Sequence, residues 1–108
     1  MKLNKKIIKA IEKEIPDIGI TDEGKYYSVY VDNSWGQDFS YEITKGENEI
    51  EDLISCCDNY DAEDEFRAWY GANRGEPSCP GDLWENCEEI GETLKELSLF
   101  LRYDVLNS

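Results

Sequence analysis

Residues 81–103, GDLWENCEEIGETLKELSLFLRY, contain the strongest periodic signal in this chain. Apolar side chains recur there in alternating steps of four and three residues, the spacing that places them on one side of an α-helix. We therefore expect a long C-terminal helix with one apolar seam that packs against the rest of the fold. The seam consists of Leu83, Cys87, Ile90, Leu94, Leu97 and Leu101.

Three short β-strands are predicted in the first half of the chain. Residues 18–21 end at an Asp-Glu-Gly turn signal. Residues 26–31, YYSVYV, are aromatic and β-branched throughout most of their length. A third strand is indicated by Phe39, Tyr41 and Ile43, which alternate with polar residues. Because the connections are short, we expect an antiparallel meander.

Apolar residues at helical spacing predict helices in three other segments. Residues 3–15 place isoleucines on one side and lysines on the other, and Pro16 ends the segment. This helix is expected to lie on the sheet, with a membrane-binding basic helix as the alternative. Residues 47–59 form a second helix, and Asp61 can cap a third that ends within residues 73–77.

The predicted order of elements defines a single domain that spans residues 1–108. We expect an α+β fold with an N-terminal helix, a three-stranded antiparallel meander, and three helices packed on one face of the sheet. A helical bundle with an appended hairpin is the alternative.

Charge is unevenly distributed along the chain. Its 108 residues include 11 Lys and Arg and 25 Asp and Glu, for a formal net charge of −14. Residues 2–13 hold five lysines and one acid, whereas residues 47–96 hold 16 acids and three bases. A net charge of about 2–8 in magnitude suffices for solubility. Because such a negative field repels nucleic acid, we expect no direct nucleic-acid binding and a basic, nucleic-acid-binding protein as partner.

Several classes of protein are disfavoured by what the sequence lacks. It contains no apolar run of the roughly 18 residues that span a membrane, and no signal-peptide pattern at its N-terminus. We therefore expect a cytoplasmic protein that does not bind membranes. It contains no histidine, the commonest general base near neutral pH, and no phosphate-binding loop. We expect neither an enzyme nor a cofactor.

The four cysteines do not have the spacing of a metal or redox motif. Cys56 and Cys57 are adjacent, and Cys79 and Cys87 are eight residues apart. We expect reduced structural thiols and no metal site, with a four-thiolate zinc site as the alternative.

Acidic side chains are predicted to form one face of the C-terminal helix. At about 100° per residue they lie opposite the apolar seam and extend over about 16 Å. Two further clusters fall at residues 58–65 and 47–52, and the alternative is an ordinary solvated surface. The candidate partner-binding acids are Glu85, Glu88, Glu89, Glu92 and Glu96, together with Asp58, Asp61, Glu63, Asp64 and Glu65.

One aromatic residue is a candidate anchor for a protein partner. Trp35 lies in a turn beside Gly36 and is expected to be the exposed tryptophan. The other large aromatics, Phe66, Trp69, Tyr70, Trp84 and Phe100, are expected to pack in the core or between helices.

Part of the chain resembles a group of short acidic proteins from phages and mobile elements of gut Firmicutes. The resemblance rests on residues 60–69, YDAEDEFRAW, on Pro77 and on residues 87–97, CEEIGETLKEL, with a similar strand at 36–41. It covers roughly residues 28–101 and implies an acidic turn, a Trp-containing helix, a proline loop and a final acidic helix. Cys79 and Cys87 stand where that pattern has small or apolar residues.

The resemblance implies a biological setting, that of phages and mobile elements, more than a particular chemical activity. Small acidic phage proteins of this size include anti-restriction and anti-CRISPR proteins, several of which are DNA mimics. We therefore expect an inhibitor of a bacterial defence nuclease that blocks its DNA-binding surface. The alternative is an intracellular adaptor or accessory protein of a mobile element, binding through Trp35 and the sheet edge, whose acids serve only solubility. The oligomeric state is left open.

Overall fold

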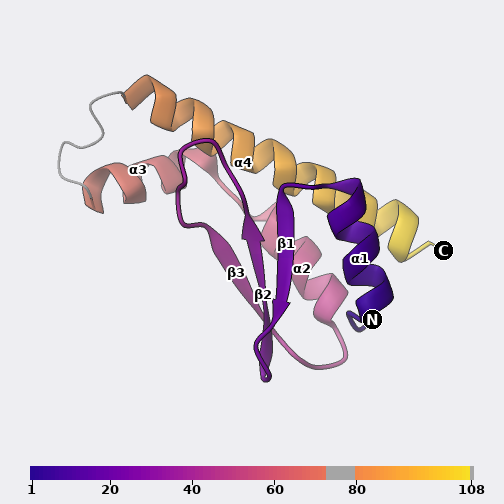
Figure 1. The fold of residues 1–108 in the computed structure, drawn as a ribbon. Coiled ribbons are helices and arrows are strands. Elements are labelled where there is room, and N and C mark those ends of the chain that lie inside the picture. The colour runs from indigo at the N-terminus through magenta and orange to yellow at the C-terminus, as the bar shows by residue number, and fades with distance from the viewer. Residues whose placement is uncertain (73–79, 108) are drawn as a thin grey trace.

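The computed structural model describes residues 1–72 and 80–107, and Figure 1 shows their arrangement. It confirms the predicted α+β fold and its order of elements. A π-helical turn, η1, continues the last helix. The elements are α1 (Lys5–Glu14), β1 (Ile18–Asp22), β2 (Tyr26–Val31), β3 (Ser40–Thr44), α2 (Glu49–Asp58), α3 (Ala62–Ala72), α4 (Pro80–Phe100) and η1 (Leu101–Val105).

The sheet is an antiparallel meander in the order β1-β2-β3. Ile18 pairs with Val31 across the first two strands, and Tyr27 pairs with Ile43 across the second and third. Since side chains alternate along a strand, one face carries the buried Val29, Val31 and Ile43. The sheet is therefore apolar on its core face, as predicted.

On the opposite face of the sheet, β1 carries a glycine beneath an aromatic ring. Gly19 pairs with Tyr30, and a Cβ added at Gly19 would lie 2.0 Å from Cζ of the tyrosine. The missing side chain lets the ring of Tyr30 lie across the neighbouring strand, which covers the glycine backbone. Gly19 is buried although it faces away from the core.

The helices cover the core face of the sheet. α1 packs on β1, α2 packs on β3, and α4 packs on α2 and α3. α3 contacts mainly α4, and together with the first turns of α4 it extends past the sheet (Figure 1). The molecule is accordingly elongated, with extents of 44 × 26 × 21 Å.

α1 lies on the sheet, as expected. Its first turn is capped by Asn4, whose Oδ1 accepts the Ile7 N–H at 2.9 Å. Ile11 is fully buried, and Ile7 and Ile8 are half-buried against the same core. The lysines face away from it and are exposed.

The apolar seam of α4 is confirmed. All six seam residues from Leu83 to Leu101 are fully buried. The chain continues beyond Phe100 in a π-helical turn, in which the Leu106 N–H donates to the Leu101 carbonyl at 2.9 Å. The wider turn keeps Val105 buried and extends the helical segment slightly beyond its predicted end.

Candidate functional site

Five exposed glutamates occupy the solvent side of α4, opposite its buried seam. At 1.5 Å per residue, the first and last are about 16 Å apart along the helix axis. None of the five forms an ion pair with another residue in the described ranges 1–72 and 80–107. We call this surface the α4 acidic face; it consists of Glu85, Glu88, Glu89, Glu92 and Glu96.

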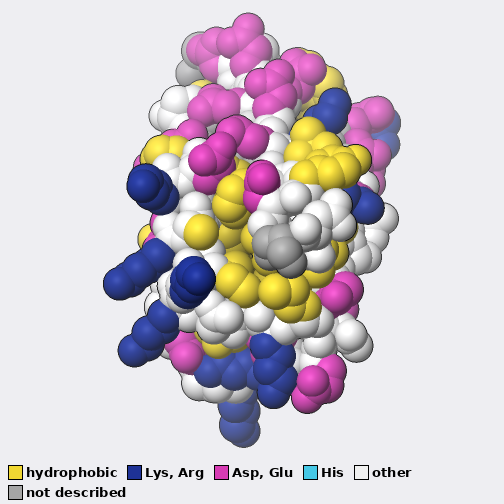
Figure 2. Space-filling view, turned by 90° about the vertical axis from the view of Figure 1, so that its right-hand side faces the viewer, with side chains coloured by type: hydrophobic (Ala, Val, Ile, Leu, Met, Phe, Trp, Pro, Cys, Tyr) yellow, Lys and Arg dark blue, Asp and Glu magenta, His cyan; other side chains and the backbone are white. Residues whose placement is uncertain are grey.

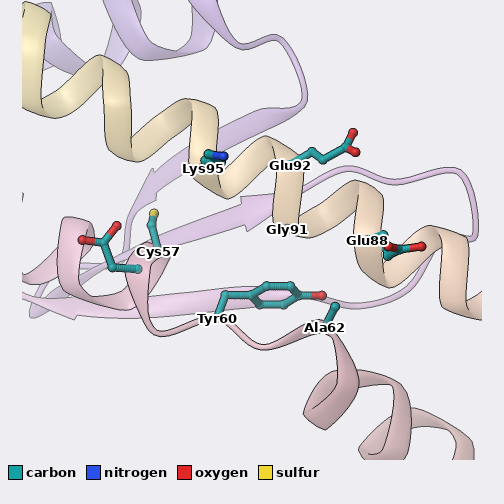
Figure 3. A pocket seen from close by; sticks show the side chains of 8 residues that line it. Cys57, Tyr60, Ala62, Glu88, Gly91, Glu92 and Lys95 are labelled. Carbon is teal, nitrogen blue, oxygen red and sulfur yellow. The ribbon is translucent and has the colours of Figure 1, made fainter.

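An open pocket of about 510 Å³ lies beside this face. It lies between α4, the end of α2 and the start of α3. Figure 3 shows Glu88 and Glu92 on its α4 side. Asp58 contributes a third carboxylate from α2, and Lys95 contributes the one cation among the described lining residues. The fold thus brings acids from two helices to the rim of one pocket.

Tyr60, in the connection between α2 and α3, contacts α4 across one edge of this pocket. Its hydroxyl donates to the Cys87 carbonyl at 2.7 Å, and a Cβ added at Gly91 would lie 3.1 Å from its ring. The glycine therefore allows the α2–α3 connection to approach α4 closely. Burial of this hydroxyl raises the pKa of Tyr60 well above its usual value.

Two thiols near the pocket are buried and do not resemble reactive cysteines. Burial raises the pKa of Cys57 to about 12 and that of Cys87 to about 11. Thiols with such pKa values stay protonated at neutral pH and are weak nucleophiles. Cys79 lies outside the described residues. Among those described, no group of three Cys, Asp or Glu side chains is placed to hold a metal ion.

A second acidic group lies at the start of α3. Asp61, Asp64 and Glu65 line a smaller hollow of about 350 Å³ that shares Tyr60 with the first pocket. Asp61 accepts the N–H of Glu63 at 2.9 Å, which confirms it as the cap of α3. This group therefore lies next to the pocket acids, across Tyr60 from them.

Other predicted acids are engaged in contacts that stabilise the fold. Glu63 forms an exposed ion pair with Arg67, and Asp58 forms one with Arg102. Glu89 accepts a hydrogen bond from the Ser34 hydroxyl at 3.1 Å. These contacts neutralise Asp58 and Glu63, so the strongest uncompensated charge is on α4 itself.

The acidic cluster at residues 47–52 does not extend the α4 acidic face. Glu51 pairs with the N-terminal ammonium group at 2.6 Å, and Glu47 lies 3.5 Å from the Lys2 ammonium. Glu49 is only 3% exposed and accepts the backbone N–H groups of Leu3 and Gly46. These acids hold the N-terminal segment against α2.

A network of buried side-chain amides links the β2–β3 loop to α3 and α4. The Asn86 amide donates to Gln37 Oε1 at 2.9 Å and to Asn33 Oδ1 at 3.1 Å. The Gln37 amide in turn donates to Glu65 at 2.8 Å. Sequence reasoning missed this network, because three separate amides in polar surroundings have no recognisable spacing.

The expectation that Trp35 is the exposed tryptophan is wrong. The loop that carries it is tied to α4, since Ser34 donates to both Asn86 and Glu89, and Trp35 is half-buried. Trp84 is instead 37% exposed. It contacts Phe66 of α3 edge-to-face, with ring centroids 5.7 Å apart, so the predicted packing between helices is present but leaves one side open.

Charge is segregated along the molecule. On the face that Figure 2 shows, most Asp and Glu side chains lie in the upper part and most Lys and Arg side chains in the lower left, with both kinds along the right-hand side. α1 carries four exposed lysines, Lys5, Lys6, Lys9 and Lys13. The two ends would therefore meet partners of opposite charge.

Comparison with known proteins adds no assignment. No protein-family model, curated protein or solved structure matches this chain. Within the described helices, none is long and apolar enough to cross a membrane.

The Asp58 ion pair predicts a pH-dependent contribution to stability. The Ser98 hydroxyl, which donates to Asp58 at 2.7 Å, and the Arg102 guanidinium lower the pKa of this carboxyl. Because its pKa is lower in the folded than in the unfolded protein, the contact stabilises the fold above about pH 4. The contribution is lost as the pH falls through the folded-state pKa.

Asp58→Asn is therefore expected to lower the free energy of unfolding near neutral pH by about 1 kcal/mol or less, since the pair is exposed. At about pH 2 the variant and the parent should become equally stable. Urea denaturation at both pH values measures this. Asp38→Asn, at an exposed position, is the matched control and should show no difference. A destabilisation of Asp58→Asn that persists at low pH would contradict the assignment.

Proposed function

We propose that this protein is a phage or mobile-element inhibitor of a bacterial defence nuclease. In this proposal it is an anti-CRISPR protein that acts in the host cytoplasm. Its carboxylates occupy the DNA-binding surface of an RNA-guided nuclease in place of phosphates. The observation that carries the proposal is the α4 acidic face, whose five exposed carboxylates form no ion pair within the described ranges.

The spacing of these charges supports mimicry of one DNA strand. Five carboxylates over about 16 Å give one charge per roughly 4 Å along the helix. One strand of DNA carries a charge per about 3.4 Å. Asp61 and Asp64, at the start of α3, add charge in the hollow that shares Tyr60 with the pocket beside α4. A cleft lined by lysine and arginine would therefore meet a density of charge close to that of its normal ligand.

The mechanism requires no catalysis, metal or cofactor. An RNA-guided nuclease reads the short duplex motif beside its target with arginines and holds the heteroduplex backbone with lysines. Both side chains donate strong, charge-assisted hydrogen bonds to carboxylates. A carboxylate bound at these positions excludes a phosphate from them. Long-range attraction between the two surfaces also accelerates association.

Competition with DNA tests the proposal directly. The purified protein is titrated into an RNA-guided nuclease loaded with guide RNA, and duplex-DNA binding is followed by fluorescence anisotropy. We expect mutually exclusive binding, and an affinity that falls about tenfold or more as salt rises from about 0.05 M to about 0.2 M. Simultaneous binding of protein and DNA, or an affinity independent of salt, would contradict mimicry.

The alternative proposal is an adaptor that binds through apolar surface while its acids serve solubility. The exposed Tyr30 on the open face of the sheet favours it, whereas the half-buried Trp35 does not. In that case the complex should persist at high salt, because apolar contacts are not screened.

A further inference from the structure

A second surface lies away from the α4 acidic face, between α1 and the C-terminal turn. It is a groove of about 390 Å³. Figure 2 shows hydrophobic side chains exposed on this side of the molecule, with Lys and Arg side chains beside them. Five of its lining residues are apolar, and the polar ones comprise one base, one acid and one amide. The apolar residues are Met1, Ile7, Ala10, Phe100 and Val105, and the polar ones are Lys6, Asp104 and Asn4.

Large apolar side chains are exposed both in this groove and on the C-terminal segment that forms one of its sides. Met1 is 42% exposed at one end, and on the C-terminal segment Tyr103 is 65% and Leu106 39% exposed. In a protein with a strongly polar surface, contiguous exposed apolar groups mark an interaction site. The groove therefore has the concave, apolar floor that receives side chains of a partner.

Lysines outnumber acids on the α1 side of the groove, whereas the C-terminal side contributes one acid, Asp104. Lys6 lines the groove, and Lys5, Lys9 and Lys13 are exposed on the same helix. None of these four lysines forms an ion pair within residues 1–72 and 80–107, where Lys2 is the lysine of this segment that does. α1 thus presents four lysines against two acids, Glu12 and Glu14, beside a groove that is mainly apolar.

We propose that this groove binds an acidic amphipathic helix of a partner protein. The apolar side of that helix would enter the groove, and its acids would face the lysines of α1. The ten residues of α1 are about 15 Å long, which matches about three turns of a partner helix. This interaction does not depend on the inhibitor function proposed for the opposite end.

Two other occupants fit the surface less well. A planar membrane would reach the lysines but not the floor of a concave groove, which a side chain enters. A second copy related by a two-fold axis would place α1 against α1 and oppose lysines with lysines. The combination of a groove and basic charge favours the acidic helix.

The test uses a synthetic peptide of about 14 residues with leucines on one helical face and glutamates on the other. Binding to the full chain is measured by fluorescence anisotropy, and the site is mapped by amide chemical shifts. We expect shifts in α1 and in residues 100–106. A peptide with serines in place of leucines should bind about tenfold more weakly or worse.

Two test variants and one control distinguish the contribution of the groove to peptide binding from that of the lysines. Lys6→Glu with Lys13→Glu should weaken peptide binding by about tenfold or more, whereas Lys25→Glu with Lys95→Glu, which changes net charge equally, should have little effect. Ala10→Trp fills the groove at an exposed position and should also abolish binding. Circular dichroism shows whether each variant keeps its fold.

Three outcomes would overturn the proposal. The first is peptide binding that neither the Lys6 and Lys13 variant nor Ala10→Trp weakens. The second is tight binding to vesicles of anionic phospholipid without binding to the peptide, which would indicate a membrane surface. The third is a stable dimer in sedimentation that buries the shifted residues.

Discussion

Replacing Glu85, Glu92 and Glu96 by lysine is expected to abolish inhibition of the target nuclease. Each substitution turns an attractive contact into a repulsive one, so three of them change the local charge of the α4 acidic face by six units. We expect the affinity for the nuclease to fall by roughly a hundredfold or more at low salt. Glu89 is left unchanged because its contact with Ser34 stabilises the fold. DNA cleavage in the presence of each protein measures the effect.

A charge-matched control separates the α4 acidic face from net charge. Glu14, Glu23 and Glu42 are exposed outside that face, and their replacement by lysine alters the total charge by the same amount. This second variant should still inhibit, with at most a moderate decrease in association rate. If both variants inhibit equally, the carboxylates of α4 are not the contact surface, and the adaptor proposal gains.

Leu94→Ala is expected to lower the free energy of unfolding by about 2–5 kcal/mol. Leu94 is fully buried at the centre of the α4 seam and packs in the core formed by sheet and helices. Its removal loses the transfer free energy of the side chain and leaves a cavity that the surrounding residues cannot fill. Urea denaturation followed by circular dichroism measures the difference.

Leu99 provides the comparison on the same helix. It is 47% exposed, so Leu99→Ala changes the same atoms without leaving a buried cavity, and should alter stability by no more than about 0.5 kcal/mol. Equal losses for the two variants would show that α4 is not oriented as described. The two leucine variants thus test which side of α4 is buried and, with it, which side presents the glutamates.

The sequence carried enough information to predict the elements of the fold. The alternating steps of the α4 seam depend only on helix geometry, and the cap at Asp61 depends only on neighbouring backbone N–H groups. Short connections between strands left little choice but an antiparallel meander. Signals of this kind are local, so one sequence is sufficient to read them.

The compensation of charges could not be predicted in the same way. Asp58 and Arg102 are 44 positions apart, and their ion pair exists only because α2 packs on η1. Nothing in the sequence distinguishes Glu49, which is buried and accepts backbone N–H groups, from the nearby acids Glu47 and Glu51, which are exposed. Tertiary packing decides which acids remain free, and a helical wheel for a single helix does not contain that information.

The same packing gives the α4 acidic face a mechanical property. Because the seam on its inner side is held in the core, the helix keeps its glutamate backbones at fixed separations before any partner arrives. An unstructured acidic tail with the same charge would have to be ordered on binding, at a loss of backbone conformational entropy. If α4 binds a basic cleft as proposed, it therefore does so as a rigid template that discriminates between clefts by the spacing of their cations.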